Sequence, residues 1–429
     1  MSGSTRAARW AIAGGALVLA LAAASLARTR RPPDLIFVVL DTVRSASVSV
    51  CGYDRPTTPV LERLRDEGWS VTCAGVSPGT WTTPSHASFL TGWPVPEFEG
   101  GRRVPSPDET LPGQLAARAY QTVLVSGNMV LRKPDWMAGG FERSRIARDF
   151  DELDGEALSD AVAGELAAID PTRPLFLFVN IADAHAPYPA IPDGIDWAPP
   201  QRPVQHRLWT DDTSAPLHRY VAGAMSEEDA ARYRERLTNG YDHAVLQADR
   251  SLGALLDVLR DAGRLDDARV VVTSDHGEFV GEHGLVGHGE TLFEAGVRVP
   301  VLAFDSRRAL PPFPEPFSAL HAHALLLSGT FPADATAASV VAHRPDAPKG
   351  YDGVAVWGAG DTKLLWREGT FERFDLAGDP TESAPLPVGD HPQRAELDAL
   401  VGRHRVALDA PDTADHETIE LLRAAGYVE

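Results

Sequence analysis

The chain has very few cysteines and, for its length, few basic residues. Only Cys51 and Cys73 occur among 429 residues, so the fold is not built on a framework of disulfides. One bridge between them and two unpaired thiols both fit the sequence. Lys and Arg total 40 against 60 Asp and Glu, and the resulting net charge of -20 disfavours binding to nucleic acid or to an anionic membrane surface.

Only the N-terminus carries a long uncharged run. Arg6 and Arg9 precede the run at residues 10–27, and further arginines follow it. With about 18 residues, the run is at the lower limit for a membrane-spanning helix, while Ser25 and Ala27 resemble a signal-peptide cleavage site. Residues 1–31 are therefore predicted to be a signal peptide or an N-terminal membrane anchor. Either one places the remaining chain on the periplasmic or extracellular side, secreted or membrane-anchored.

Shorter apolar runs recur along the chain, at 35–40, 121–126, 175–180, 270–273 and 299–304. Runs of this length without alternation are typical of buried strands in a parallel sheet. Helical patterns lie between them, and the clearest has Leu252, Leu255 and Leu259 on one face and ends near Gly263. This alternation predicts an α/β fold with a doubly wound, mostly parallel sheet flanked by helices.

The chain changes character beyond residue 305. Prolines cluster at 311–316, and a Gly- and Asp-rich stretch precedes a predicted hairpin at 363–376. We therefore predict a catalytic α/β domain at 34–330 and a small C-terminal α+β subdomain at 331–429.

Acidic and imidazole side chains follow several of the predicted strands. Asp41 comes directly after the first strand, and the pair Asp275 and His276 follows the strand at 270–273. Ligands bind beyond the carboxyl ends of the strands in such sheets, so these side chains are expected to meet at one edge. Carboxylates and imidazoles are common ligands of divalent cations. The three residues are predicted to hold one divalent metal ion, although an isolated Asp-His pair is more often a turn with a capping role.

A threonine hydroxyl is predicted at the N-terminus of a helix. Pro84 and Ser85 suit the first turn, which would place Thr82 just before it, where free backbone N–H groups favour an anion. A threonine hydroxyl is a poor nucleophile unless a metal or a base helps to remove its proton, and coordination to a neighbouring cation would lower the pKa of the hydroxyl. Thr82 is therefore predicted to be the nucleophile, whereas an isolated Thr-x-Pro-Ser would be a simple helix cap.

Two histidines complete the predicted site. His185 opens a His-Ala-Pro-Tyr-Pro segment after the strand at 175–180, and His288 precedes a glycine. A lone histidine is usually a satisfied surface or core residue. Two histidines at the same sheet edge as a metal pair are better interpreted as groups that contact the ester oxygens and protonate a leaving group.

The order of these motifs resembles the sulfatase family of the alkaline phosphatase superfamily. The resemblance rests on segments at 40–44, 52–59, 82–92, 185–188, 241–249, 274–284 and 374–380. It implies an alkaline-phosphatase-like fold and assigns the metal ligands, the nucleophile and the two histidines the roles given above. It also implies substrate contacts at His86, where family members have arginine, and at Asn128, near which they have basic residues.

The nucleophile position departs from the family pattern. Sulfatases have Cys or Ser at the position of Thr82, and this residue is oxidised to formylglycine. Threonine cannot form that aldehyde, so no formylglycine is expected. A hydrated aldehyde has two hydroxyls, one to accept sulfate and one to expel it, whereas Thr82 has a single hydroxyl and its ester must be released by attack at phosphorus or sulfur. This favours a phosphate or phosphonate ester over a sulfate ester.

The acid that commonly follows the first ligand is replaced by Thr42, which makes the site less negative. Manganese and zinc therefore compete with calcium and magnesium, and the identity of the metal stays open. We expect a metal-dependent ester hydrolase that forms a covalent intermediate on Thr82 and acts on a small anionic ester or on a lipid or glycan. The alternatives are a membrane-associated transferase of the phosphoethanolamine-transferase type and a non-catalytic pseudoenzyme.

Overall fold

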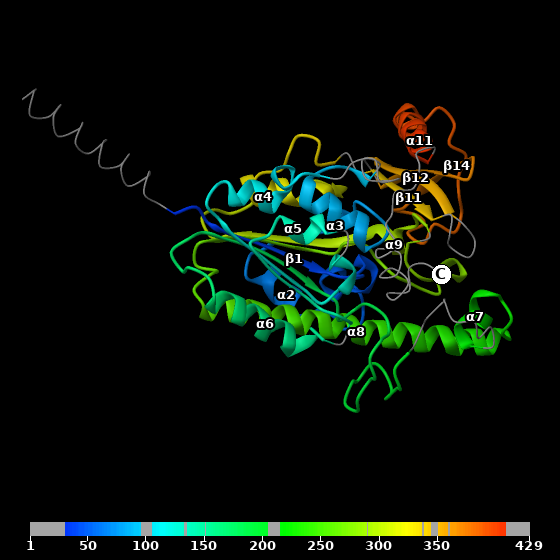
Figure 1. Cartoon of the computed structure of the whole chain (residues 1–429). Helices are drawn as coiled ribbons and strands as arrows, with labels where there is room; N and C mark the ends of the chain where they lie inside the picture. The colour runs from blue at the N-terminus through cyan, green and yellow to red at the C-terminus, as the bar shows by residue number, and fades with distance from the viewer. Residues whose placement is uncertain are drawn as a thin grey trace, which may run out of the picture.

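The centre of the molecule is an eight-stranded sheet in the order β10-β2-β9-β6-β1-β5-β3-β4 (Figure 1). The computed structural model describes residues 31–95, 105–132, 135–150, 152–204, 215–289, 291–336, 339–344, 351–358 and 361–408. The strands are β1 (Asp34–Leu40), β2 (Ser70–Val76), β3 (Gln121–Ser126), β4 (Arg143–Ile146), β5 (Leu175–Ile181), β6 (Ala268–Thr273), β9 (Arg298–Asp305) and β10 (Phe317–Ser318). Strand β9 is antiparallel to both of its neighbours, and the other pairs are parallel. The predicted fold class is confirmed.

All five predicted apolar runs are strands of this sheet. Every residue of β1, β3, β5 and β6 is buried, which explains why these strands show no alternation of apolar and polar residues. The sequence did not predict β2, β4 or β10. Strand β4 reads Arg-Ser-Arg-Ile and is largely exposed at the sheet edge, while β10 has only two residues.

Helices cover both faces of the sheet (Figure 1). One face carries α2 (Pro59–Asp66), α6 (Gly155–Ala167) and α8 (Glu227–Asp261), and the other carries α3 (Thr82–Thr91), α4 (Leu111–Ala116), α5 (Trp136–Gly139) and α10 (Ala322–Ser328). Successive side chains of β1 enter opposite cores: Ile36 and Val38 lie in the cluster with α8, and Phe37 and Val39 in the cluster with α3. Both faces of the sheet are therefore buried.

Helix α8 is the longest described helix and confirms the predicted helical pattern. The Ser226 side chain accepts a hydrogen bond from Asp229 N at its N-terminus, and Gly263 has a φ of 66° just beyond its end. The three leucines of the predicted apolar face are fully buried. The short helix α7 (Pro216–Val221) precedes it (Figure 1).

A four-stranded antiparallel sheet follows in the C-terminal part. It contains β11 (Ser339–Arg344), β12 (Tyr351–Gly358), β13 (Thr362–Arg367) and β14 (Thr370–Asp375), and β13–β14 is the predicted hairpin. Helix α11 (Arg394–Leu408) covers one face, and the other face shares an apolar cluster with the segment before β9 (Figure 1). The division into domains at residue 330 stays a prediction.

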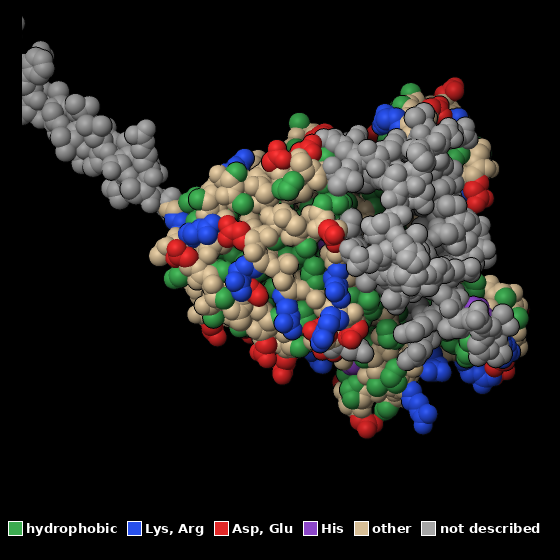
Figure 2. Space-filling view, in the orientation of Figure 1, with side chains coloured by type: hydrophobic (Ala, Val, Ile, Leu, Met, Phe, Trp, Pro, Cys, Tyr) green, Lys and Arg blue, Asp and Glu red, His purple; other side chains and the backbone are tan. Residues whose placement is uncertain are grey.

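The segment between β6 and β9 contains only short elements. These are β7 (Phe279–Val280), the 3-10 turn η7 (Glu282–Gly284), β8 (Val286–Gly287) and α9 (Glu294–Val297). The other described 3-10 turns are η1 (Ser45–Ser47), η2 (Ser49–Cys51), η5 (Pro107–Glu109), η6 (Met129–Arg132) and η8 (Ala319–His321). Acidic and basic side chains are interspersed over the described part of the surface seen in Figure 2.

Cys51 and Cys73 form a disulfide, with their Cα atoms 5.7 Å apart. The bridge joins η2 to β2. Of the two alternatives that the sequence allowed, a single bridge or two unpaired thiols, the structure shows the bridge. The predicted signal peptide or anchor, including the apolar run at 10–27, lies outside the described residues. Within the described part of the chain, no helix combines the length and the apolar character that are needed to cross a bilayer.

Candidate active site

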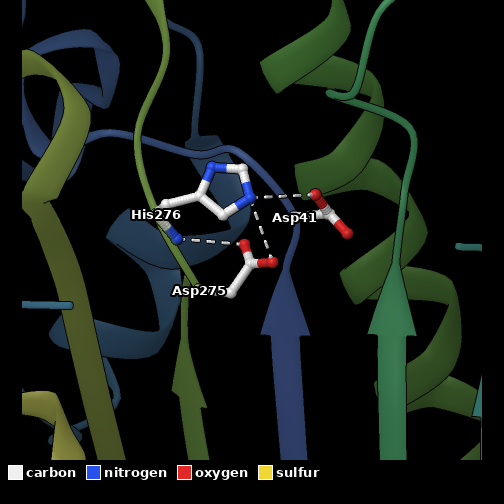
Figure 3. Close-up of side chains that lie close together, drawn as sticks. All are labelled: Asp41, Asp275 and His276. Carbon is white, nitrogen blue, oxygen red and sulfur yellow. Dashed lines mark hydrogen bonds and ion pairs between the residues drawn. The ribbon is translucent and has the colours of Figure 1, made fainter. Parts of the chain in front are cut away.

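Asp41, Asp275 and His276 meet at the carboxyl ends of β1 and β6, as the sequence predicted (Figure 3). One ligand atom from each residue lies within 4.8 Å of the corresponding atoms of the other two, and all three side chains are fully buried. The His276 Nε2 atom is 3.3 Å from Asp275 Oδ2 and 3.9 Å from Asp41 Oδ1. Figure 3 shows the three side chains pointing toward one another.

The backbone after β1 turns sharply at Thr42. Strands β1 and β6 are parallel neighbours, so Asp41 and Asp275 leave the sheet side by side. Thr42 has a φ of 62°, which is a strained conformation for a β-branched residue, and its N–H donates to Asp275 Oδ1 (3.2 Å). The Tyr241 hydroxyl donates to the Thr42 carbonyl (2.7 Å) and holds this turn from α8. The turn therefore links the two acids directly.

Each carboxylate is oriented through one of its two oxygens. Asp41 Oδ2 accepts hydrogen bonds from Asn128 Nδ2 (2.8 Å) and Asn180 Nδ2 (2.9 Å). Asp275 Oδ1 accepts from the backbone N–H groups of Thr42 and His276. Among the described residues, Asp41 Oδ1 and Asp275 Oδ2 have no hydrogen-bond donor although both are buried. These two oxygens therefore suit a divalent cation.

The imidazole of His276 is oriented in the same way. Its Nδ1 lies 3.0 Å from the Gly277 carbonyl oxygen and donates its hydrogen there, which leaves the Nε2 lone pair facing the two acids. A backbone carbonyl in this position is the usual partner of a metal-binding histidine. Two carboxylate oxygens and one imidazole nitrogen thus face one another, and this donor set fits a divalent metal ion.

The charges of these residues depend on each other. Burial, together with the charge of Asp275, raises the pKa of Asp41. Burial alone would raise the pKa of Asp275, but the neighbouring His276 lowers it. Burial alone would lower the pKa of His276, but the two carboxylates raise it to about 9. A cation between the two acids would take the place of the proton on this histidine.

Thr82 lies within the same cluster. It is the first residue of α3, so its hydroxyl stands in the first helical turn rather than just before it, and Trp81 is the residue that precedes the helix. Thr82 is fully buried, and its Oγ1 is 3.4 Å from His276 Nε2 and 3.3 Å from Asn128 Nδ2. The structure therefore brings the predicted nucleophile and the predicted ligands together, while the role of Thr82 stays a prediction.

His86 and Asn128 both form hydrogen bonds with residues of this cluster. The His86 Nδ1 donates to the Thr82 carbonyl (2.9 Å), and its Nε2 accepts from Asn180 Nδ2 (3.1 Å). Burial lowers the pKa of His86, which favours its neutral form. Asn128 is fully buried and its amide contacts both Asp41 and Thr82. Both side chains form hydrogen bonds with other residues of the protein in this structure. Their predicted contacts with substrate stay predictions.

His185 and His288 are brought to the same place. The ring of His288 is 4.3 Å from that of His276, centroid to centroid, and 5.3 Å from that of His185. His185 Nδ1 donates to the Ala186 carbonyl (2.7 Å), and the ring of Phe150 stacks on it at 4.3 Å. The two histidines therefore border the candidate metal site, at the sheet edge where the sequence analysis expected them, while their roles stay predictions.

The carboxylate of Glu278 orients His288. Its two oxygens are 3.2 and 3.3 Å from His288 Nδ1, and the Glu278 side chain is fully buried. A hydrogen on Nδ1 donated to this carboxylate leaves Nε2 for a different partner. Glu278 was not among the predicted site residues, and neither was Asn180. Each could have been found as a polar residue beside a predicted ligand or inside an apolar strand.

The chain is similar in sequence to a known protein family over most of its length. The family model described as Sulfatase matches residues 33–324. Arylsulfatase A of Homo sapiens is 27% identical over 326 residues, which cover 67% of this chain and 61% of the relative. The chain thus spans less than two thirds of the length of this relative.

Solved structures share the fold at low sequence identity. The phosphonate monoester hydrolase of Agrobacterium radiobacter superposes with a TM-score of 0.62 at 15% identity, covering 88% of this chain and 95% of that chain. The C-terminal periplasmic domain of a phosphoethanolamine transferase from Campylobacter jejuni superposes with a TM-score of 0.52 at 16% identity, covering 70% and 89%. At such identities, these similarities show the fold alone.

Proposed function

Because the chain belongs to the sulfatase family, as its match over residues 33–324 shows, we propose that it is a metal-dependent ester hydrolase that forms a covalent intermediate on Thr82. The observation that carries this proposal is the position of the Thr82 hydroxyl, 3.4 Å from His276 Nε2 beside two buried carboxylates. A nucleophile, a cation site and two histidines then share one edge of the sheet.

Asp41, Asp275 and His276 would hold the metal ion. Two carboxylates buried side by side need a counter-charge, and their two oxygens without donors are the atoms that would receive it. When bound, a divalent cation lowers the pKa of an adjacent hydroxyl and neutralises negative charge on the transferred group. The donor set suits manganese, zinc, magnesium or calcium, and the identity of the metal stays open.

The protein side chains supply attack, orientation and proton transfer. Asn128 donates toward Thr82 Oγ1 and holds it beside Asp41, and Thr82 Oγ1 would release its proton to solvent and attack the phosphorus or sulfur of the ester. As this bond forms, the bond to the alcohol oxygen breaks, and that oxygen takes a proton from His288 Nε2. Water would then attack the same central atom and return a proton to His288 Nε2, while Thr82 Oγ1 leaves and regains its proton from solvent. His185 would contact the oxygens of the transferred group.

The proposed substrate is a phosphate or phosphonate ester of a small molecule, a lipid or a glycan. Thr82 has one hydroxyl, so release of the intermediate requires attack at the central atom, and no formylglycine is involved. A similar fold occurs in a phosphonate monoester hydrolase and in a phosphoethanolamine transferase, whereas a curated relative is an arylsulfatase. A sulfate ester is therefore the second substrate class to be tested.

A transfer reaction is the second candidate function. The same intermediate on Thr82 could be attacked by an alcohol of a lipid or glycan in place of water, and the similarity to a phosphoethanolamine transferase favours this alternative. We also propose that the protein works outside the cytoplasm, since a disulfide such as Cys51–Cys73 persists mainly in oxidising compartments. Retention of the N-terminus in a membrane fraction would favour the transferase.

The proposal is tested with aryl phosphate, phosphodiester, phosphonate and sulfate esters, each with manganese, zinc, magnesium and calcium. We expect hydrolysis of a phosphorus ester that depends on one of these ions and is lost in Thr82→Ala. The control Thr91→Ala removes a hydroxyl at the other end of the same helix and should retain activity. Full activity of Thr82→Ala would remove this residue from the mechanism, and faster hydrolysis of the sulfate ester would reverse the substrate assignment.

A further inference from the structure

The segment between β6 and β9 carries His276, Glu278 and His288 and is tied to the short helix at its end. The N–H of Gly277 donates to the carbonyl of Gly296 in α9 (2.8 Å). The N–H of Glu278 donates to the carbonyl of Ala295 in the same helix (3.0 Å). The backbone directly after the candidate ligand His276 is therefore fixed to α9.

Gly277 and α9 are in very close contact. A β-carbon at Gly277 would lie 2.1 Å from the carbonyl oxygen of Ala295, a distance that no side chain could occupy. Only glycine therefore permits this approach. Because Gly277 packs directly against α9, a displacement of α9 would also displace the backbone that carries His276.

The C-terminal sheet supplies a buried cation to this region. Lys363 on β13 is fully buried, and its Nζ donates to Glu382 Oε1 (2.7 Å), to Glu294 Oε1 (3.0 Å) and to the carbonyl oxygen of Leu292. All three ammonium hydrogens thus have acceptors. The ring of Trp357 lies 4.7 Å from Nζ. Of these acceptors, Glu294 is the first residue of α9 and Leu292 lies just before this helix.

The surrounding charges balance. Glu294 also accepts from Arg298 Nε (2.6 Å) and from Trp357 Nε1 (2.8 Å), and Glu382 accepts from the backbone N–H of Glu294 (2.5 Å). Two cations therefore face two carboxylates. Without the charge of Lys363, two buried carboxylates would share one cation, an arrangement that favours movement of one of them toward solvent.

We propose that Lys363 is a positioning residue, which acts through α9 on the segment that carries His276, Glu278 and His288. Lys363 lies outside residues 33–324, which the family model matches. The C-terminal sheet would therefore influence the geometry of the candidate active site without contributing a side chain to it. The expected effect on kcat/KM rests on the proposed ester hydrolysis. The expected effects on the 277–297 segment and on metal affinity do not.

The test compares Lys363→Met with Arg269→Met. Arg269 forms a similar buried ion pair with Asp305 (3.0 Å), but it lies at the opposite end of β6 from the candidate site. Both variants are examined by hydrogen exchange of the amides at 277–297, by binding of Mn²⁺ and by kcat/KM. In Lys363→Met we expect amide exchange to accelerate, Mn²⁺ affinity to fall and kcat/KM to fall by about tenfold or more. We expect no such changes in Arg269→Met.

Wild-type exchange at residues 277–297 in folded Lys363→Met, or equal effects of both variants, would overturn the inference. Faster exchange without a change in Mn²⁺ affinity or kcat/KM would also overturn it. If Lys363→Met does not fold, Glu382→Gln removes one charge of the same cluster, and the same three measurements apply. A wild-type protein that binds Mn²⁺ but hydrolyses no ester contradicts the proposed function, and exchange and Mn²⁺ affinity still decide the role of Lys363.

Discussion

Asp41 is held at one oxygen by two amide side chains, which leaves its other oxygen to face Asp275 and His276. Amide side chains can donate to a carboxylate without adding charge, so the pair orients Asp41 and would leave its negative charge for a cation. The same amides reach Thr82 and His86, which connects the proposed nucleophile to the proposed metal ligand Asp41 through shared hydrogen bonds.

Replacement of Asn180 by alanine should weaken metal binding. The variant removes one of the two donors to Asp41 and the donor to His86 Nε2, and loss of such a supporting hydrogen bond typically costs about tenfold or more in metal affinity. Calorimetric titration with Mn²⁺ and Zn²⁺ measures the effect. Gln121→Ala is the control, since this amide bonds to the backbone of Asp170 near the other end of the sheet. Equal affinity in wild type and Asn180→Ala would contradict the proposed support.

Replacement of Glu278 by glutamine should slow hydrolysis most for substrates with poor leaving groups. The carboxylate orients His288, and a misoriented proton donor matters when the departing alcohol needs a proton. We expect kcat/KM to fall by about a hundredfold for alkyl esters and much less for nitrophenyl esters. Glu282→Gln breaks the neighbouring ion pair with Arg44 and serves as the comparison. The same loss for both kinds of ester would argue against His288 as the acid.

At the scale of elements, the central strands could be predicted, whereas β2 and the two edge strands β4 and β10 could not. β1, β3, β5 and β6 lie between two helical layers, so each contains consecutive apolar residues that stand out from the rest of the sequence. β4 has only one apolar residue, because it lies at the exposed edge where burial places little demand on the sequence. Strands and helices whose side chains face solvent show only a weak pattern of apolar residues in the sequence.

Helices α2 and α8 are joined by an acid that the sequence did not identify as structural. Asp249 is buried, and its two oxygens accept the backbone N–H groups of Val60 and Leu61 at the start of α2. Burial raises the pKa of Asp249 to about 7, although the two hydrogen bonds act in the opposite direction. The carboxylate therefore caps one helix from the middle of another.

This acid should make stability depend on pH. The pKa of Asp249 is higher in the folded state than its ordinary value of 3.8, so the folded state binds more protons than the unfolded state between about pH 4 and pH 7. The contribution to stability is complete below this window and is lost as the pH rises through it, by roughly 2–4 kcal/mol. Urea denaturation of Asp249→Asn should show a flatter pH dependence. The exposed Asp257→Asn on the same helix should keep the wild-type slope, and an unchanged slope in both would contradict the prediction.

At the scale of the whole molecule, the site is assembled from segments far apart in the chain. Asp41, Thr82 and Asn128 come from the first third of the sequence, whereas Asp275 and His276 follow β6. The rule that ligands gather beyond the carboxyl ends of parallel strands was enough to bring the acids and imidazoles together. It could not reveal which side chain hydrogen-bonds to which, because Asn180 and Glu278 take part through contacts that depend on rotamers and packing.

The disulfide should contribute to global stability. It closes a loop with a sequence separation of 22 residues, for which the chain-entropy estimate is about 3 kcal/mol. Urea denaturation of Cys51→Ser with Cys73→Ser should show a loss of this size. Addition of a reductant should lower the stability of the wild type and leave the double variant unchanged. A wild type that responds to reductant no more than the variant would show that the bridge does not form in solution.

The central claim is that a cation held by Asp41, Asp275 and His276 lies within bonding reach of the Thr82 hydroxyl. Anomalous X-ray diffraction from crystals grown with Mn²⁺ or Zn²⁺ measures this directly. We predict one strong anomalous peak between Asp41 Oδ1, Asp275 Oδ2 and His276 Nε2, at bonding distance from Thr82 Oγ1. A peak elsewhere on the protein, or none at these residues with the metal in excess, would contradict the claim.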